Sequence, residues 1–187
     1  MKIEDQYRAA AGVWTDIQDH LPRLVNLAIE LNAKRVIELG VRFGTSTVAW
    51  LYAMEQTKGH LWSVDIIQQW IGIESDRWTF VEADDTHPVT REMLPDNADI
   101  VFIDTSHEYQ HTLDELDLYL QHLRPGGAFV LHDTNVERFD HHTPGSQPAF
   151  PVRQAVEDFK TMTLDRMNVV YREEYYPESY GLTILRF

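Results

Sequence analysis

The sequence predicts an α/β fold with a doubly wound, mostly parallel sheet. Apolar runs of strand length alternate with segments of helical periodicity along most of the chain. This alternation requires right-handed crossovers, which produce a parallel sheet with helices on both faces. The 187 residues, 43% of them hydrophobic, suffice for one sizeable core but not comfortably for two. The prediction is therefore a single domain spanning 1–187.

The chain is predicted to open with a helical segment, 1–32. Residues 15–32 place apolar side chains at helical spacing, with Thr15 or Asp16 as the N-cap. Pro22 is expected near the first turn of the main helix, where its missing N–H costs little. The stretch before Thr15 is either partly disordered or folded over the ligand edge.

A buried strand follows, and the alternation of strand and helix then repeats. The glycine that closes the first strand predicts a tight turn after it. The predicted strands cover 35–40, 60–66, 78–85, 98–105 and 128–134. The predicted helices between them cover 45–55 and 110–123, and the sequence RPGG ends the second helix.

The C-terminal section has a different character. A long polar stretch, 134–150, predicts an active-site loop, because long loops in compact domains are usually functional or mobile. A helix near 151–162 follows it. The strands predicted at 168–176 and 180–187 are separated only by a Pro-Glu-Ser connection, which is too short for a parallel crossover. These two strands therefore predict an antiparallel hairpin.

Acidic residues stand at or beside the ends of five successive strands. They are Glu38, Asp65, Asp84, Asp104 and Asp133. In open parallel sheets, ligands bind beyond the carboxyl ends of the strands. Polar residues at strand ends are ordinary, but an acid at each of five strands predicts a shared ligand edge.

The composition excludes several classes of function. A formal charge of -14 disfavours nucleic acid as a partner, because binding to phosphates depends on clustered Lys and Arg. A neutral or cationic small molecule fits this charge better. The chain has no cysteine, no run of transmembrane length and no signal-peptide pattern. The expectation is a soluble cytoplasmic protein that does not associate with membranes.

The turn after the first strand lacks the glycine pattern of a dinucleotide-binding site. The dinucleotide fingerprint requires glycines at 40, 42 and 45, but the chain has Gly40, Arg42 and Thr45. Arg42 stands where the backbone would approach a pyrophosphate, so NAD and FAD are disfavoured. Asp65, about 25 residues after the first glycine, can accept hydrogen bonds from both hydroxyls of a ribose.

The chain resembles the class I S-adenosylmethionine-dependent methyltransferases. The segments that carry the resemblance are VIELGVRFGTST, LWSVDI, FVEADD, DIVFIDTSHEY and LRPGGAFVLHDT. The resemblance implies the seven-stranded Rossmann-like sheet of that family, with its antiparallel last strand. IDTSHEY and PGGAFVLHD are further similar to segments of the small O-methyltransferases of the macrocin and cephalosporin-tailoring type, which implies a sugar or natural-product hydroxyl as acceptor and often a divalent cation.

The resemblance also implies roles for individual residues. Glu38 would arrange the turn that follows its strand, Asp65 would bind the ribose, and Asp84 or Asp85 would contact the adenine; Asp85 is equally well read as a turn residue. The implied cofactor-binding residues are Glu38, Gly40, Ser46, Asp65, Asp84, Asp85 and Asp104.

Asp104 and Asp133 are candidates for a metal site, because they close strands predicted to be neighbours. Related metal-dependent enzymes have an acid before the second of these aspartates, whereas this chain has His132. A histidine ligand would shift the preference from Mg²⁺ towards Mn²⁺ or Fe²⁺. His132 and Asp133 are expected on opposite faces if the strand persists. His132 is therefore either the third ligand or a core histidine bonded to backbone.

The candidate catalytic residues are His107, Asp104 and Asp133. An acceptor hydroxyl needs a base or a cation, and an unperturbed histidine pKa of about 6.5 suits a base near neutral pH. The alternative for His107 is a surface residue that caps the following helix.

Two other functions remain open at this level, a non-catalytic S-adenosylmethionine-binding protein and, less favoured, a nicotinamide-dependent oxidoreductase. The sequence does not specify the acceptor. The first helix or the aromatic C-terminal hairpin offers a surface for a homodimer.

Overall fold

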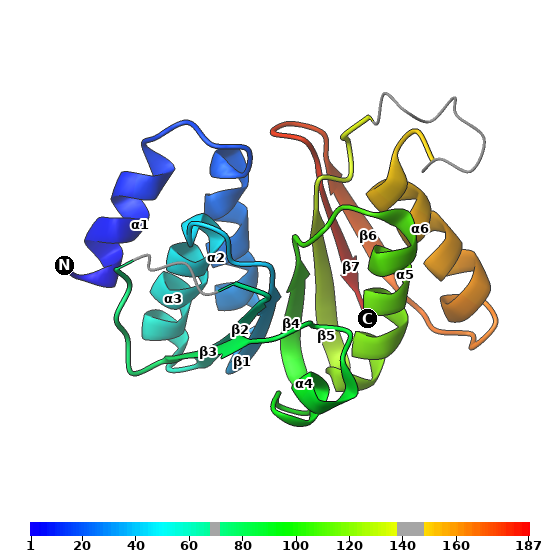
Figure 1. Cartoon of the computed structure of the whole chain (residues 1–187), viewed down its shortest axis with the longest axis horizontal. Helices are drawn as coiled ribbons and strands as arrows, with labels where there is room; N and C mark the ends of the chain where they lie inside the picture. The colour runs from blue at the N-terminus through cyan, green and yellow to red at the C-terminus, as the bar shows by residue number, and fades with distance from the viewer. Residues whose placement is uncertain (68–71, 138–147) are drawn as a thin grey trace.

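The computed structural model describes residues 1–67, 72–137 and 148–187. In this part of the chain, one seven-stranded sheet has the order β3-β2-β1-β4-β5-β7-β6 (Figure 1). Its strands are β1 Arg35–Leu39, β2 His60–Asp65, β3 Trp78–Glu82, β4 Ala98–Ile103, β5 Leu123–His132, β6 Arg172–Tyr176 and β7 Leu182–Arg186. β7 pairs antiparallel with both β5 and β6, and the other pairs are parallel. The predicted fold class and the terminal hairpin are confirmed.

Helices cover both faces of the sheet (Figure 1). One face carries α1 Ile3–Ala11, α2 Leu21–Glu30 and α3 Thr45–Thr57, and the other carries α5 Tyr109–Tyr119 and α6 Pro151–Phe159. Alternate strand residues enter the two cores, as Phe102 and Val101 do in β4. Because both faces are buried, the central strands are continuous apolar runs in the sequence.

The N-terminal segment differs from its prediction. α2 begins at Leu21, after a separate 3-10 turn at Gln18–His20, so Thr15 and Asp16 do not cap it. Pro22 lies in the first turn of α2, as predicted. Helix α1, within the predicted helical segment 1–32, packs against α3, and the stretch between α1 and α2 lies over the ligand edge.

The second half of the sheet has boundaries that the pattern did not reveal. α5 ends at Tyr119, a 3-10 turn covers Leu120–His122, and β5 begins at Leu123. The predicted helix to 123 is therefore too long, and RPGG lies within β5. The reason is tertiary, since Leu123 pairs with Ala98 before the register of β4 and β5 shifts.

Other elements need smaller corrections. The short helix α4, Pro88–Glu92, was not predicted. β3 ends at Glu82, so Asp84 and Asp85 lie in the turn after the strand. α6 continues into a π-helical turn, Lys160–Leu164, close to the predicted end. Residues 138–147, most of the predicted active-site loop, lie outside the described residues. None of the described helices has the length and apolar character needed to cross a membrane.

Candidate functional site

A cavity of about 930 Å³ lies at the carboxyl ends of the central strands. It is bordered by the stretch before α2, by the loops after β1, β2, β3 and β4, by the start of α3, by one residue of α5 and by Tyr180. The sequence-predicted residues that line it are Gly40, Ser46, Asp65, Asp84, Asp85, Asp104 and His107. Glu38, His132 and Asp133 are not among the described lining residues.

Gly40 makes the turn that forms the floor of the cavity. Its φ of 87° lies in the left-handed region, which glycine adopts without steric cost. A Cβ at this position would overlap the backbone carbonyl of Asp104. The end of β1 thus approaches the end of β4 more closely than any side chain allows.

Asp65 holds the loop after β1. Its Oδ2 accepts hydrogen bonds from the backbone N–H groups of Val41 (2.8 Å) and Arg42 (3.0 Å), and its Oδ1 accepts one from Ile67 (3.1 Å). The Arg42 side chain forms an exposed ion pair with Asp16 at 3.0 Å. Asp65 therefore connects the end of β2 to the turn that begins at Gly40.

Glu38 lies beneath the cavity and is fully buried. Its carboxylate accepts hydrogen bonds from Ser46 (2.7 Å), Thr47 (2.9 Å) and Ser63 (2.5 Å). Burial raises the pKa of Glu38 to about 7, although these three hydroxyl donors oppose the rise. Glu38 thus anchors the start of α3 to β1 and β2.

The two aspartates after β3 face different partners. Asp84 accepts hydrogen bonds from the backbone N–H and the hydroxyl of Thr86 (2.9 and 2.7 Å), so Asp84 is the turn residue. Asp85 is buried and lies 3.2 Å from His111 of α5. Asp85 thus lies in the turn, as its alternative reading has it, and is also buried against His111.

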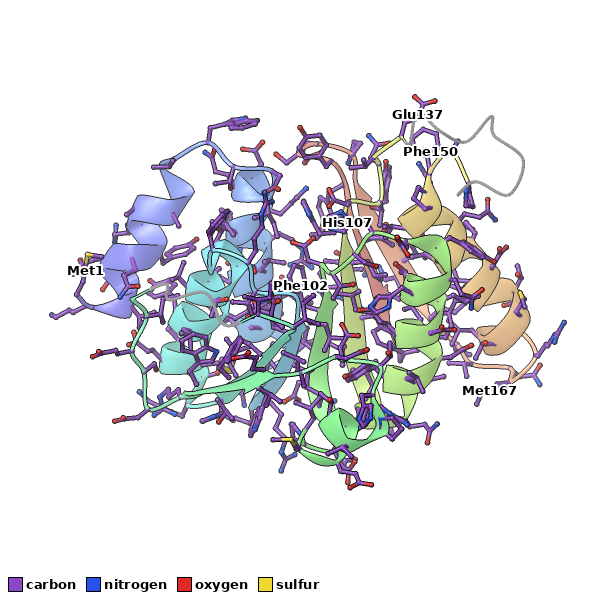
Figure 2. The ribbon with its side chains drawn as sticks, viewed as in Figure 1. Met1, Phe102, His107, Glu137, Phe150 and Met167 are labelled. Carbon is purple, nitrogen blue, oxygen red and sulfur yellow. The ribbon has the colours of Figure 1, made fainter. Side chains whose placement is uncertain are left out.

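Asp104, His107 and Asp133 form a cluster at the ends of β4 and β5. Nε2 of His107 lies 3.1 Å from Oδ1 of Asp104 and 2.9 Å from Oδ2 of Asp133. One donor atom from each residue lies within 4.8 Å of the other two. Figure 2 shows His107 at the carboxyl ends of the central strands.

The cluster binds a proton tightly in the absence of a cation. Burial alone would lower the pKa of His107, but the carboxylates of Asp104 and Asp133 outweigh burial and raise it to about 9. The same contacts hold the pKa of Asp133 well below its ordinary value, against the effect of burial. The expected histidine pKa of about 6.5 is therefore wrong for this arrangement. The helix-cap alternative for His107 is wrong too, since α5 has Glu108 as its N-cap.

His132 contacts the cluster from its buried side. Its Nδ1 lies 3.3 Å from Oδ1 of Asp104 and 3.5 Å from Oδ1 of Asp133, and its Nε2 lies 2.9 Å from the carbonyl of Ser179. β5 ends at His132, and Asp133 turns into the left-handed region, so the expected opposite orientation of the two side chains is wrong. The backbone bond to Ser179 matches the core-histidine alternative. His107, rather than His132, is the nitrogen donor grouped with the two aspartates.

The sequence prediction missed several cavity residues. They include Trp14, Thr105, Ser106, His111 and Tyr180. His111 carries an available signal, because Glu115 follows it at the i,i+4 spacing of a helix face. Glu115 is fully buried, and burial, then the Asp85 carboxylate, raise the pKa of Glu115 well above its ordinary value.

The described lining of the cavity is acidic. It contains one arginine, Arg42, and two histidines, His107 and His111, against five carboxylates, Asp16, Asp65, Asp84, Asp85 and Asp104. Its mouth carries exposed apolar side chains, among them Trp14, Phe43 and Ile66. Such a lining suits a ligand with positive charge and apolar surface.

Known proteins are similar to this chain in sequence and in structure. Residues 37–134 match the model of a family described as a methyltransferase domain. The SAH-bound methyltransferase PaMTH1 of Podospora anserina is similar in structure, with a TM-score of 0.68 and 16% identity over 99% of this chain and 87% of that one. An O-methyltransferase from Bacillus cereus in complex with SAH has a TM-score of 0.66 and 15% identity over 98% and 89%.

A third similar structure is larger. MycE, a methyltransferase of the mycinamycin biosynthetic pathway in complex with Mg and SAH, has a TM-score of 0.66 and 17% identity over 90% of this chain. The chain spans only 48% of the length of MycE. The comparison with curated proteins found no match. At these identities, the solved structures establish the shared fold.

Proposed function

The chain belongs to the methyltransferase domain family, and from this premise we propose that it transfers a methyl group from S-adenosylmethionine to a hydroxyl group of a small molecule. The observation that carries the proposal is the acidic cavity, whose lining contains the Gly40 turn, Asp65 and, beside the turn, Asp104 and His107. The Gly40 turn and Asp65 suit a cofactor, and Asp104 and His107 suit the hydroxyl of an acceptor.

The acidic lining supports S-adenosylmethionine as the donor. The methyl group of this cofactor is carried by a positively charged sulfonium, which five lining carboxylates attract. Asp65 uses three of about four acceptor positions on backbone N–H groups, so one position remains for a ribose hydroxyl. Binding to both hydroxyls requires the loop at Val41 and Arg42 to release one bond. Asp85 faces the cavity at the position proposed for the adenine.

The cluster of Asp104, His107 and Asp133 fits a divalent cation. Two carboxylates and one imidazole converge within 4.8 Å, and an imidazole donor suits Mn²⁺ or Fe²⁺ better than Mg²⁺. A cation held by these residues would lower the pKa of an acceptor hydroxyl. MycE, whose structures contain Mg and SAH, is a fold relative consistent with this arrangement.

Methyl transfer from a sulfonium is an in-line displacement, so the protein supplies orientation and a route for the acceptor proton. Asp104, which lines the cavity, orients the acceptor hydroxyl as a hydrogen-bond acceptor, and Asp133 acts through His107, which it contacts at 2.9 Å. His107, already protonated between them, keeps the two carboxylates together. The acceptor proton then passes to the carboxylate of Asp104, or to Nε2 of His107 in molecules in which His107 is neutral. A sugar or another natural-product hydroxyl is the proposed acceptor class.

Titration calorimetry with S-adenosylmethionine, SAH and NAD tests the donor. We expect micromolar binding of the first two and none of NAD; the opposite result would favour a nicotinamide-dependent oxidoreductase. Mass spectrometry of reactions with hydroxylated sugars and phenols then tests catalysis. Cofactor binding without methylation of any acceptor would favour a non-catalytic binding protein.

A further inference from the structure

A second cluster of possible ligands lies beside the cavity, apart from Asp104, His107 and Asp133. Nε2 of His111 lies 3.2 Å from Oδ1 of Asp85 and 3.6 Å from Oε1 of Glu115. His111 and Glu115 are four residues apart on α5 and share one face of that helix, and Asp85 reaches them from the turn after β3. One donor atom from each lies within 4.8 Å of the other two.

The two carboxylates of this cluster are buried, and the one described side chain that can oppose their two negative charges is His111. Glu115 is fully buried and Asp85 is 7% exposed. Oε1 of Glu115 accepts a hydrogen bond from Thr105 at 2.8 Å, but Oε2 receives none from any described residue. Among the described ion pairs, none joins a lysine or arginine to Asp85 or Glu115. Two adjacent buried carboxylates are costly unless a cation or a proton lies between them.

We propose that Asp85, His111 and Glu115 form a second divalent-cation site, suited to Mn²⁺, Fe²⁺ or Zn²⁺. Metal–ligand bonds of about 2.0–2.2 Å place neighbouring donors roughly 3.0–3.5 Å apart, close to the separations of 3.2 and 3.6 Å from His111 to the two carboxylates. Two carboxylates and a neutral imidazole balance the charge of a divalent ion. The imidazole disfavours Mg²⁺ and Ca²⁺.

The cavity gives this site an entry path and free coordination positions. Asp85 and His111 line the cavity, whereas Glu115 closes the site from the protein side. A cation there would face the ligand next to Asp85. The site goes beyond methyl transfer and does not depend on it, because cation binding is measured without S-adenosylmethionine.

The competing arrangement is a protonated Glu115 that shares its proton with Asp85. Both arrangements relieve the repulsion between the carboxylates, so cation binding must decide between them. The experiment is Mn²⁺ titration of the chelator-treated full chain, with free Mn²⁺ measured by electron paramagnetic resonance. The variants are Glu115→Gln, Asp133→Asn and, as a control at the N-cap of the same helix, the exposed Glu108→Gln.

We expect Glu115→Gln to lose one equivalent of bound Mn²⁺, or at least tenfold in its affinity. Asp133→Asn and Glu108→Gln should retain that equivalent. Should Glu115→Gln fail to fold by circular dichroism, His111→Asn serves in its place, because His111 is partly exposed. The proposal is overturned if the wild type binds no Mn²⁺, if the Glu115 or His111 variant binds as the wild type does, or if Asp133→Asn abolishes all binding.

Discussion

Nε2 of His107 lies 2.9 Å from Oδ2 of Asp133, and both residues have left-handed backbone, with φ of 56° and 57°. Non-glycine residues in this region cost of order 1 kcal/mol, and such strain clusters at functional sites. The ends of β4 and β5 therefore hold the two side chains together at a cost in backbone energy. This pairing suggests that the cluster is maintained for its chemistry.

Asp133→Asn should reduce methyl transfer about 100-fold or more, because the substitution removes the charge that binds the His107 proton and holds His107 beside the acceptor. Binding of S-adenosylmethionine should stay within about threefold, since Asp133 does not line the described cavity. Turnover assays and calorimetry on the same preparation separate the two effects. The highly exposed Asp96→Asn is the matched control. Full activity in Asp133→Asn would remove Asp133 from the site.

Gly40→Ala should abolish cofactor binding and destabilise the fold by about 1–3 kcal/mol or more. The added Cβ would overlap the carbonyl of Asp104, and alanine disfavours a φ of 87°. Urea denaturation and calorimetry with SAH measure the two losses. Gly12→Ala is the control, because its Cβ would meet only ordinary contacts. Normal SAH binding by the Gly40→Ala variant would show that the cofactor does not depend on this turn.

The sequence predicts the sheet well because burial on both faces leaves a local signature. The central strands are apolar without interruption, and the hairpin connection is too short for a crossover. Helix ends are predicted less well, since the start of β5 depends on the pairing of Leu123 with Ala98. A local pattern does not contain that pairing.

The same distinction applies to the site. The acids at strand ends are visible in the sequence, and the ligand edge follows from the topology of parallel sheets. That Glu38 is buried depends on hydroxyl groups from α3 and β2, which only the folded chain brings together. The pKa of His107 likewise depends on its second carboxylate, Asp133, at the end of another strand.

Removal of metal should lower activity if a cation assists the reaction. Treatment with a chelator is expected to reduce turnover at least tenfold, and Mn²⁺ should restore it better than Mg²⁺, because an imidazole belongs to the donor set. The measurement is initial rate against added metal. Glu115→Gln should keep this response, since it leaves Asp104, His107 and Asp133 intact. Unchanged activity after complete chelation would show that the carboxylates and His107 act without a cation.

Glu38 should make stability fall as pH rises through the weakly acidic range. Burial raises the pKa of Glu38 from 4.5 to about 7, so between these values the folded protein holds a proton that the unfolded chain has lost. The free energy of unfolding therefore decreases from about pH 4.5 to pH 7, by on the order of 3 kcal/mol in total. Glu38→Gln should remove this component.

Urea denaturation of the wild type and of Glu38→Gln at about pH 5.0, 5.7 and 6.4 measures how the free energy of unfolding changes with pH in each protein. The difference between the two slopes is the contribution of Glu38. Glu115, whose pKa is also raised, contributes a fall of the same sign to both proteins, so it cancels in the difference. The contribution of His107, whose folded pKa is about 9, is fully present below its unfolded pKa and is lost only at higher pH. Glu92→Gln, an exposed substitution of the same kind, should keep the wild-type slope. Equal slopes in Glu38→Gln and the wild type would mean that Glu38 is ionised in the folded protein throughout, with the three hydroxyl donors outweighing its burial.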